Sequence, residues 1–166
     1  MEMTPQLARE IWEYDEYTGK LYWKVPSHNN NAGKGKEAGS VRWNGSMYFM
    51  TVGYKGKRFP IANIIWMIVY GVTPRDIIDH IDRDQTNNLT SNLREATSQQ
   101  NSFNRRDRTD NTTGYQGVVV FRGKFRAAIT HNRKFIYIGV YETAEEAYEA
   151  YKQKAKELFG EFARFE

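Results

Sequence analysis

Residues 77–104 constrain the fold more than any other stretch, because two short apolar segments there flank a loop rich in asparagine. Residues 77–81 (IIDHI) predict one short strand, and residues 93–96 (LREA) predict a second. Thr97 or Ser98 can then cap a helix. The expected order is therefore strand, irregular loop, strand, helix.

A carboxylate and an imidazole are neighbours in the first of these strands, at Asp79 and His80. Hydrolysis of a phosphodiester requires a base that activates water and a cation that neutralises charge on the phosphate. Histidine can accept a proton near neutral pH, and a carboxylate with an amide oxygen from the following helix can hold a hard divalent cation. Because neighbours on a regular strand point to opposite faces, the strand must twist or end here if both residues serve one site. The alternative is structural: Asp79 caps a turn, and His80 and the asparagines supply loop hydrogen bonds.

The spacing within DHIDRDQTNNLTSNLREATSQQN resembles the HNH motif of phage and intron-encoded homing endonucleases. Asn92 follows His80 by 12 residues, and Asn101 follows Asn92 by 9. The resemblance spans residues 40–105 and includes the start of that module at Trp66, Gly71 and Pro74. It implies a ββα-metal nuclease domain that hydrolyses DNA.

The same resemblance implies a role for each residue of the motif. His80 would be the general base, and Asn92 would orient it through hydrogen bonds of the loop. Asp79 and Asn101 would be the metal ligands. Many members of the family have a second histidine where this chain has Asn101, so Mg²⁺ or Mn²⁺ is expected rather than Zn²⁺. The alternatives are Asn104 in place of Asn101 and Asn88 in place of Asn92.

Basic residues are concentrated in the segment 105–134, which carries eight arginines and lysines against two aspartates. Residues 142–166 are net acidic, with seven glutamates against four basic residues. Three alternating strands are predicted within residues 114–141, and Thr143 is a natural N-cap for a last helix. A basic segment of this kind fits an anionic partner such as nucleic acid. A solvated basic face with no partner is the alternative.

Residues 114–165 resemble the DNA-binding domain of plant ethylene-response factors, which also occurs fused to phage HNH nucleases. The features that carry the resemblance are Gly117-Val118, Gly123-Lys124-Phe125, Ile138-Gly139 and residues 143–147 (TAEEA). It implies a three-stranded antiparallel sheet that enters the major groove, with one helix packed behind it. Gln116 and Val119 replace arginines that plant members tend to carry, which leaves this sheet with fewer groups for reading base edges.

Alternation along the predicted strands assigns Ala127 and Ile129 to the face toward the helix, and Phe135 and Tyr137 to the outer face. The DNA-binding residues expected from this pattern and from the basic segment are Arg105, Arg106, Arg122, Lys124, Arg126, Thr130, Arg133, Lys134 and Tyr137.

The first third of the chain predicts a mixture of short elements. Leu7, Ile11, Trp12 and Tyr14 have helix-like spacing. A strand at 21–25, a loop at 27–39 and strands joined by Asn-Gly and Lys-Gly turns follow. A buried helix is expected at Ile61 to Tyr70, ending at Gly71.

The composition excludes two classes of site, and the residue order argues against secretion and against a membrane span. The chain has no cysteine, so disulfides and thiolate zinc sites are excluded, and any metal must depend on oxygen ligands. The N-terminus lacks the residue order of a signal peptide, and the apolar run 61–70 is far shorter than the ~20 residues of a membrane span. A cytoplasmic protein without membrane association is expected, within a bacterial host if phage-encoded.

Together these observations predict a two-domain α+β protein. The expected parts are an HNH nuclease domain with an N-terminal β-rich extension at 1–106, a linker at 107–113 and an ethylene-response-factor-like DNA-binding domain at 114–166. The expected activity is metal-dependent hydrolysis of double-stranded DNA, and a nick is the expected product because one site acts on one strand. A monomer suits a nick, whereas a dimer would suit a double-strand break. A non-catalytic DNA-binding regulator with a degenerate HNH fold is the alternative.

Overall fold

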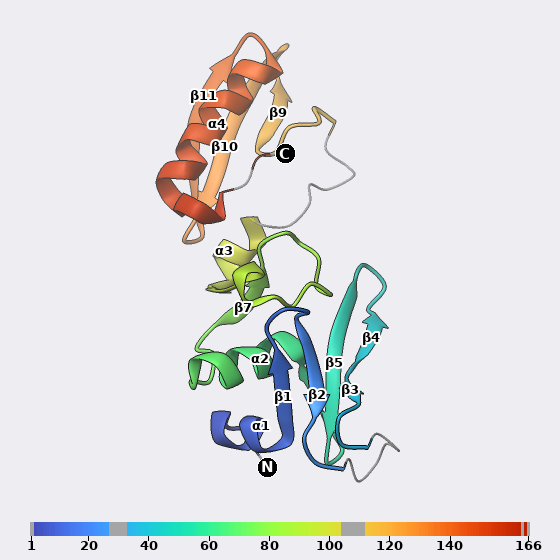
Figure 1. The fold of residues 1–166 in the computed structure, drawn as a ribbon. Coiled ribbons are helices and arrows are strands. Elements are labelled where there is room, and N and C mark those ends of the chain that lie inside the picture. The colour runs from blue at the N-terminus through green and yellow to red at the C-terminus, as the bar shows by residue number, and fades with distance from the viewer. Residues whose placement is uncertain (1, 27–32, 104–111, 164, 166) are drawn as a thin grey trace. The chain divides into compact units, whose positions relative to one another are not determined.

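The computed structural model of the protein describes residues 2–26, 33–103, 112–163 and 165. The chain is a mixed α/β protein with several small antiparallel sheets and few helices (Figure 1). It divides into two compact units, Met1–Ala96 and Thr97–Glu166. Most of the predicted linker lies outside the described residues, so the predicted domain boundary stays a prediction.

The first unit begins with helix α1 (Pro5–Ile11), whose first turn is capped by the Thr4 hydroxyl. The prediction that the helix continues through Trp12 and Tyr14 is wrong, because both residues lie in strand β1. Trp12 pairs with Trp23 across the sheet, and burial of these two rings against each other outweighs the local helical spacing. This sheet consists of β1 (Trp12–Asp15), β2 (Lys20–Trp23) and β3 (Glu37–Ala38), the last within a segment predicted to be loop.

A second sheet and a buried helix complete the core of this unit. The sheet has the order β4 (Ser40–Trp43), β5 (Tyr48–Tyr54), β6 (Lys57–Pro60), with the two predicted turns between its strands. Helix α2 (Ile61–Tyr70) ends at Gly71 in the left-handed conformation, as predicted. Ile64 and Ile65 are fully buried and pack in one cluster with Val52 of β5.

Strands β7 (Ile77–His80) and β8 (Leu93–Ala96) form an antiparallel pair in which His80 lies opposite Leu93. The two predicted strands are confirmed, although Ile81 falls outside β7. Helix α3 (Ser98–Phe103) follows, and Thr97 is its cap, because the Thr97 hydroxyl accepts a hydrogen bond from the backbone of Gln100. Since α3 belongs to the second unit, its predicted ββα packing on β7 and β8 stays a prediction.

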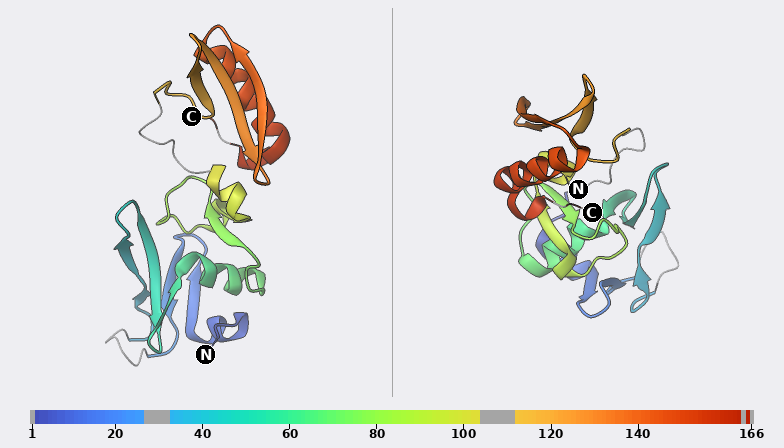
Figure 2. Two further views of the ribbon diagram at one scale, coloured as in Figure 1. Left: turned by 180° about the vertical axis from the view of Figure 1, so that it is seen from behind. Right: turned by 90° about the horizontal axis from the view of Figure 1, so that it is seen from above.

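The second unit contains a sheet of three antiparallel strands with one helix along its face (Figure 2). The helix N-terminus is closed by a capping box between Thr143 and Glu146. Buried Ala147, Tyr151 and Ala155 mark the helix face that packs on the sheet. The elements are β9 (Val118–Phe121), β10 (Lys124–His131), β11 (Lys134–Tyr141) and α4 (Ala144–Phe159). In the described part of the chain, no helix combines the length and apolar character needed to cross a bilayer.

Candidate active site

Asp79 and His80 lie where β7 ends, and both side chains are buried. Arg94 is the partner of Asp79 in the strand pair, and its Nε donates a hydrogen bond of 3.0 Å to Asp79 Oδ2. This ion pair is largely removed from solvent, with exposed side-chain fractions of 12% and 5%. Separation of the two groups would leave an unpaired charge in a site with little water, which is energetically costly. The Asp79 carboxylate is therefore held in place beside Arg94.

The His80 ring contacts Asn88 rather than Asn92. His80 Nε2 lies 3.0 Å from Asn88 Oδ1, and the Asn88 amide nitrogen donates to the carbonyl of Thr86 at 3.1 Å. Because a carbonyl only accepts, the second bond sets the orientation of the Asn88 amide and leaves Oδ1 toward the ring. Nε2 must then carry the proton, so Nδ1 is the nitrogen that can accept one when the ring is neutral.

Asn92 acts on the loop that follows His80. Its amide nitrogen donates to Asp82 Oδ1 at 2.9 Å and to the Asn87 carbonyl at 2.8 Å. Its Oδ1 accepts from the backbone of Asp82 at 3.0 Å. Through these bonds Asn92 holds the loop that follows His80. Its predicted role in orienting His80 through the loop stays a prediction.

Asp82 is the charged centre of this loop. Burial raises its pKa, but hydrogen bonds from Asn87, the backbone of Asp84 and Asn92 outweigh that effect and leave the pKa below its ordinary value. A carboxyl whose pKa is lowered on folding stabilises the fold above its unfolded-state value, near pH 4. This contribution is lost as the pH falls through the lower folded-state value.

Asn92→Ala tests the loop network. The change removes three hydrogen bonds from a buried side chain and is expected to lower the free energy of unfolding by about 1–3 kcal/mol. Denaturant unfolding measures the loss, with Ser91→Ala as the control because Ser91 is an exposed neighbour. Equal stability of the two variants would contradict the network.

The two predicted metal ligands lie in different units, Asp79 in the first and Asn101 in α3 of the second. Their pairing therefore stays a prediction, and the alternative ligand Asn104 lies outside the described residues. The donor chemistry fits a hard cation, because a carboxylate and an amide offer only oxygen. Among the residues that the structure describes, no three His, Asp or Glu side chains gather into a metal-binding group.

The predicted DNA-binding residues lie on the sheet of the second unit and at its turns, except Arg105 and Arg106, which fall outside the described residues. Arg122 and Arg133 occupy the two hairpin turns, and Lys134 starts β11; all three are exposed. Lys124 forms an ion pair with Glu142. Arg126 is half-buried, with its guanidinium 5.1 Å from the Phe121 ring centroid.

Exposed apolar side chains cover the sheet face that points away from α4. Phe135 and Tyr137 are 64% and 57% exposed, as the alternation predicts, whereas Ala127 and Ile129 are buried. Thr130 is exposed opposite Phe135. The other exposed apolar residues on this face are Val119, Phe121 and Val140. This mixture of rings and flanking cations is one that nucleic-acid-binding surfaces use.

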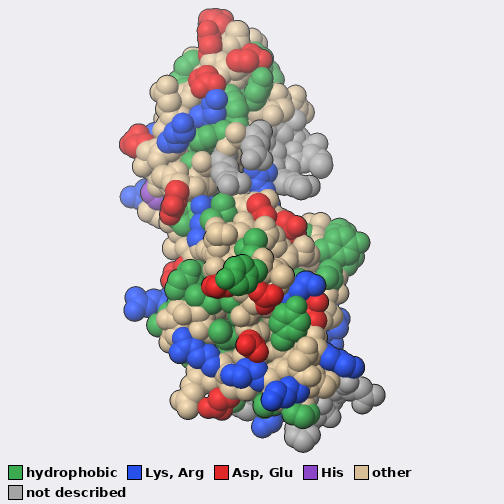
Figure 3. Space-filling view, viewed as in Figure 1, with side chains coloured by type: hydrophobic (Ala, Val, Ile, Leu, Met, Phe, Trp, Pro, Cys, Tyr) green, Lys and Arg blue, Asp and Glu red, His purple; other side chains and the backbone are tan. Residues whose placement is uncertain are grey.

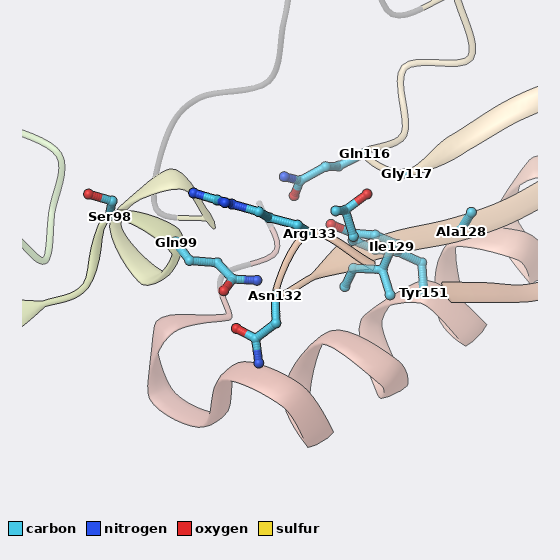
Figure 4. Close-up of a pocket in the computed structure, with 10 residues that line it drawn as sticks. Ser98, Gln99, Gln116, Gly117, Ala128, Ile129, Asn132, Arg133 and Tyr151 are labelled. Atoms are coloured by element: carbon cyan, nitrogen blue, oxygen red, sulfur yellow. The ribbon is translucent and has the colours of Figure 1, made fainter. Parts of the chain in front are cut away.

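The sequence did not indicate a pocket of about 790 Å³ in the second unit (Figure 4). Arg133 and Gln116 line it from the end of the sheet, Tyr151 from α4, and Ser98 and Gln99 from α3. Gly117 is required beside Tyr151, because a Cβ at this position would lie 2.1 Å from the tyrosine ring. Two predicted DNA-binding residues, Thr130 and Arg133, therefore share a hollow with polar groups of α3.

Comparison with known proteins shows which family the segment around the candidate site resembles. Residues 62–103, which include the four residues of the predicted site, match the family model described as HNH endonuclease. An uncharacterized HNH endonuclease of Acanthamoeba polyphaga mimivirus is 41% identical over 101 residues, which is 60% of this chain and 52% of that protein. The chain thus spans about half the length of that relative. Protein 3.8 of Escherichia phage T7 is 31% identical over 115 residues, which is 68% of this chain and 93% of that protein. The chain is therefore a homologue of Protein 3.8, and its residues 62–103 are similar to HNH endonucleases.

Proposed function

We propose that the protein is a metal-dependent DNA endonuclease that hydrolyses phosphodiester bonds in double-stranded DNA and, as a monomer, nicks one strand. The observation that supports this best is the buried Asp79–His80 pair at the end of β7, within the segment that matches the HNH family. Each of the two side chains is held by its own partner, Arg94 or Asn88. Preorganisation of this kind is what a hydrolytic site requires.

His80 is the general base of the proposed reaction. With Nε2 donating to Asn88, Nδ1 accepts a proton from the water whose oxygen attacks phosphorus. The new bond joins this oxygen to phosphorus, and the bond to the leaving deoxyribose oxygen breaks. Asn88 stabilises the imidazolium that forms, because the hydrogen bond from Nε2–H to its carbonyl oxygen becomes charge-assisted when the ring is protonated.

Asp79 and Asn101 are the residues that would hold the cation, and Mg²⁺ or Mn²⁺ fits their oxygen donors better than Zn²⁺. When bound, the divalent cation neutralises charge on the phosphate and on the leaving oxygen. Arg94 keeps the Asp79 carboxylate in place through the 3.0 Å hydrogen bond.

Asn88→Ala tests whether Asn88 positions the base. We expect the turnover number to fall roughly 10- to 100-fold, as is typical when a partner that orients a functional histidine is lost, with little change in KM for DNA. Asn88→Asp retains the acceptor oxygen and should recover part of the rate. A loss of rate that Asn88→Asp does not recover would indicate a purely structural role.

The sheet of the second unit is the proposed DNA anchor. Its outer face carries exposed rings, and three exposed cations lie at its hairpin turns or next to them: Arg122, Arg133 and Lys134. Lys124 is less available because it pairs with Glu142. Contacts of these cations with phosphates would bind DNA without reading its sequence.

A triple variant, Arg122→Ala, Arg133→Ala, Lys134→Ala, tests the anchor. The plot of log affinity against log salt should become shallower by as much as about 2.7, at ~0.9 per phosphate contact. Lys152→Ala, Lys154→Ala, Lys156→Ala is the matched control, because it removes the same charge from α4. Fluorescence anisotropy of labelled duplex over a salt series gives both slopes. Equal slopes for the two variants would show that net charge, not this face, drives binding.

A further inference from the structure

An exposed aromatic pair stands at the outer end of the β4–β5 hairpin. Trp43 and Tyr48 are cross-strand partners, their ring centroids are 4.8 Å apart, and they are 56% and 61% exposed. The turn between them is fixed by Asn44, whose Oδ1 accepts from two backbone N–H groups. In Figure 3 hydrophobic side chains gather at this end of the hairpin. Trp12 and Trp23, by contrast, are buried in the core.

The pair lies on the hairpin face that reaches the candidate active site. The register aligns Trp43 with Tyr48 and Val41 with Met50, and residues two apart on a strand share a face. Met50 Sδ accepts from Asn88 Nδ2 at 3.4 Å, and Asn88 in turn contacts His80. Tyr48 therefore lies only two residues, about 7 Å, along β5 from Met50, the side chain that touches the site. All of these residues belong to the first unit.

The sheet that carries the pair is cationic, which favours a polyanion as its partner. From Ala38 to Arg75 the chain has five basic residues and no acidic one. The basic residues are Arg42, Lys55, Lys57, Arg58 and Arg75. A cationic sheet that presents two flat rings matches nucleic acid, in which phosphates alternate with stacked bases. An acidic protein surface would match the charge but offers no regular array of π-faces for the rings.

We propose that Trp43 and Tyr48 form a wedge that contacts the bases of double-stranded DNA beside the scissile phosphate. The proposal rests on the proposed function, because the phosphate is the one that His80 would attack. Contact between the rings and partly unstacked bases would fix where the backbone crosses the site. The wedge thus supplies the first unit with a DNA contact independent of the sheet in the second unit.

Tryptophan fluorescence tests the wedge without any need for cleavage. A duplex oligonucleotide added to the full chain in EDTA should quench the emission of Trp43, because a base stacked on the indole quenches it. Trp43→Phe should abolish most of this change, since Trp12 and Trp23 are buried and Trp66 is half-buried against Tyr70 in α2. Equal quenching in wild type and Trp43→Phe, or binding of DNA with no quenching, would overturn the proposal. A change in emission with protein concentration alone would assign the surface to a second copy of the chain and would also overturn it.

A cleavage assay with matched variants completes the test. Trp43→Ala with Tyr48→Ala should weaken duplex affinity on the order of tenfold and raise KM for DNA more than it lowers turnover. Tyr17→Ala is the control, because Tyr17 is an 87% exposed aromatic residue on the turn that joins β1 and β2. Thermal melting verifies that each variant is folded. Quenching of Trp43 without DNA cleavage would support the wedge and reject the nuclease, whereas cleavage unchanged in the double variant would reject the wedge alone.

Discussion

His80→Ala is expected to lower the rate of DNA cleavage about 10²-fold or more while leaving affinity for duplex DNA nearly unchanged. The imidazole takes the proton from attacking water in the proposed reaction, but it adds no charge that holds phosphates. Single-turnover cleavage gives the rate, and anisotropy of a labelled duplex in EDTA gives the affinity.

A second variant separates chemistry from structure at this position. In His80→Gln the amide nitrogen can still donate to Asn88 Oδ1, but the side chain cannot accept a proton near neutral pH. We expect it to be as inactive as His80→Ala yet more stable. His131→Ala is the control for loss of a histidine elsewhere, since His131 packs on Phe159 in the second unit. Activity of His80→Gln near the wild-type level would end the assignment of His80 as the base.

Asp79→Asn is expected to reduce cleavage to background, with no recovery at high Mg²⁺ or Mn²⁺. An amide is a weaker ligand for a hard cation than a carboxylate, and it also weakens the bond from Arg94. The rate should be measured over a range of metal concentrations, with thermal melting to separate metal binding from folding. Asp76→Asn is the matched control, because it removes an exposed carboxylate three residues earlier. Wild-type metal dependence in Asp79→Asn would exclude Asp79 as a ligand.

Elements with local signals could be predicted from the sequence. The cap at Thr143, the left-handed Gly71 and the alternation of β10 are encoded within a few residues of where they act. The local spacing predicts a helix at Trp12 because it carries no information about the partner, Trp23, on the next strand. Strand β3 has no local signal for the same reason: only pairing with β2 makes a strand of two residues in a segment rich in glycine, lysine and asparagine.

In the candidate site, too, the features with a local signal could be predicted from the sequence, and those that depend on distant partners could not. Asp79 and His80 were identified because their types and spacing resemble a known motif. The contact between His80 and Asn88 could not be separated from the alternative with Asn92, since the path of residues 81–89 decides which asparagine reaches the ring. The ion pair with Arg94 follows from the strand register, and the contact of Met50 with Asn88 from packing of a different sheet. The spacing of residues along a motif predicts neither the register of two strands nor the packing of one sheet against another.

The central claim is metal-dependent cleavage of DNA at Asp79 and His80, and conversion of supercoiled plasmid to the nicked circle measures it most directly. Wild-type protein with Mg²⁺ or Mn²⁺ should convert the supercoiled form to the open circle, EDTA should stop the conversion, and renewed metal should restore it. His80→Gln should leave the plasmid supercoiled under every condition. Nicking that continues in EDTA, or nicking by His80→Gln at the wild-type rate, would contradict the account.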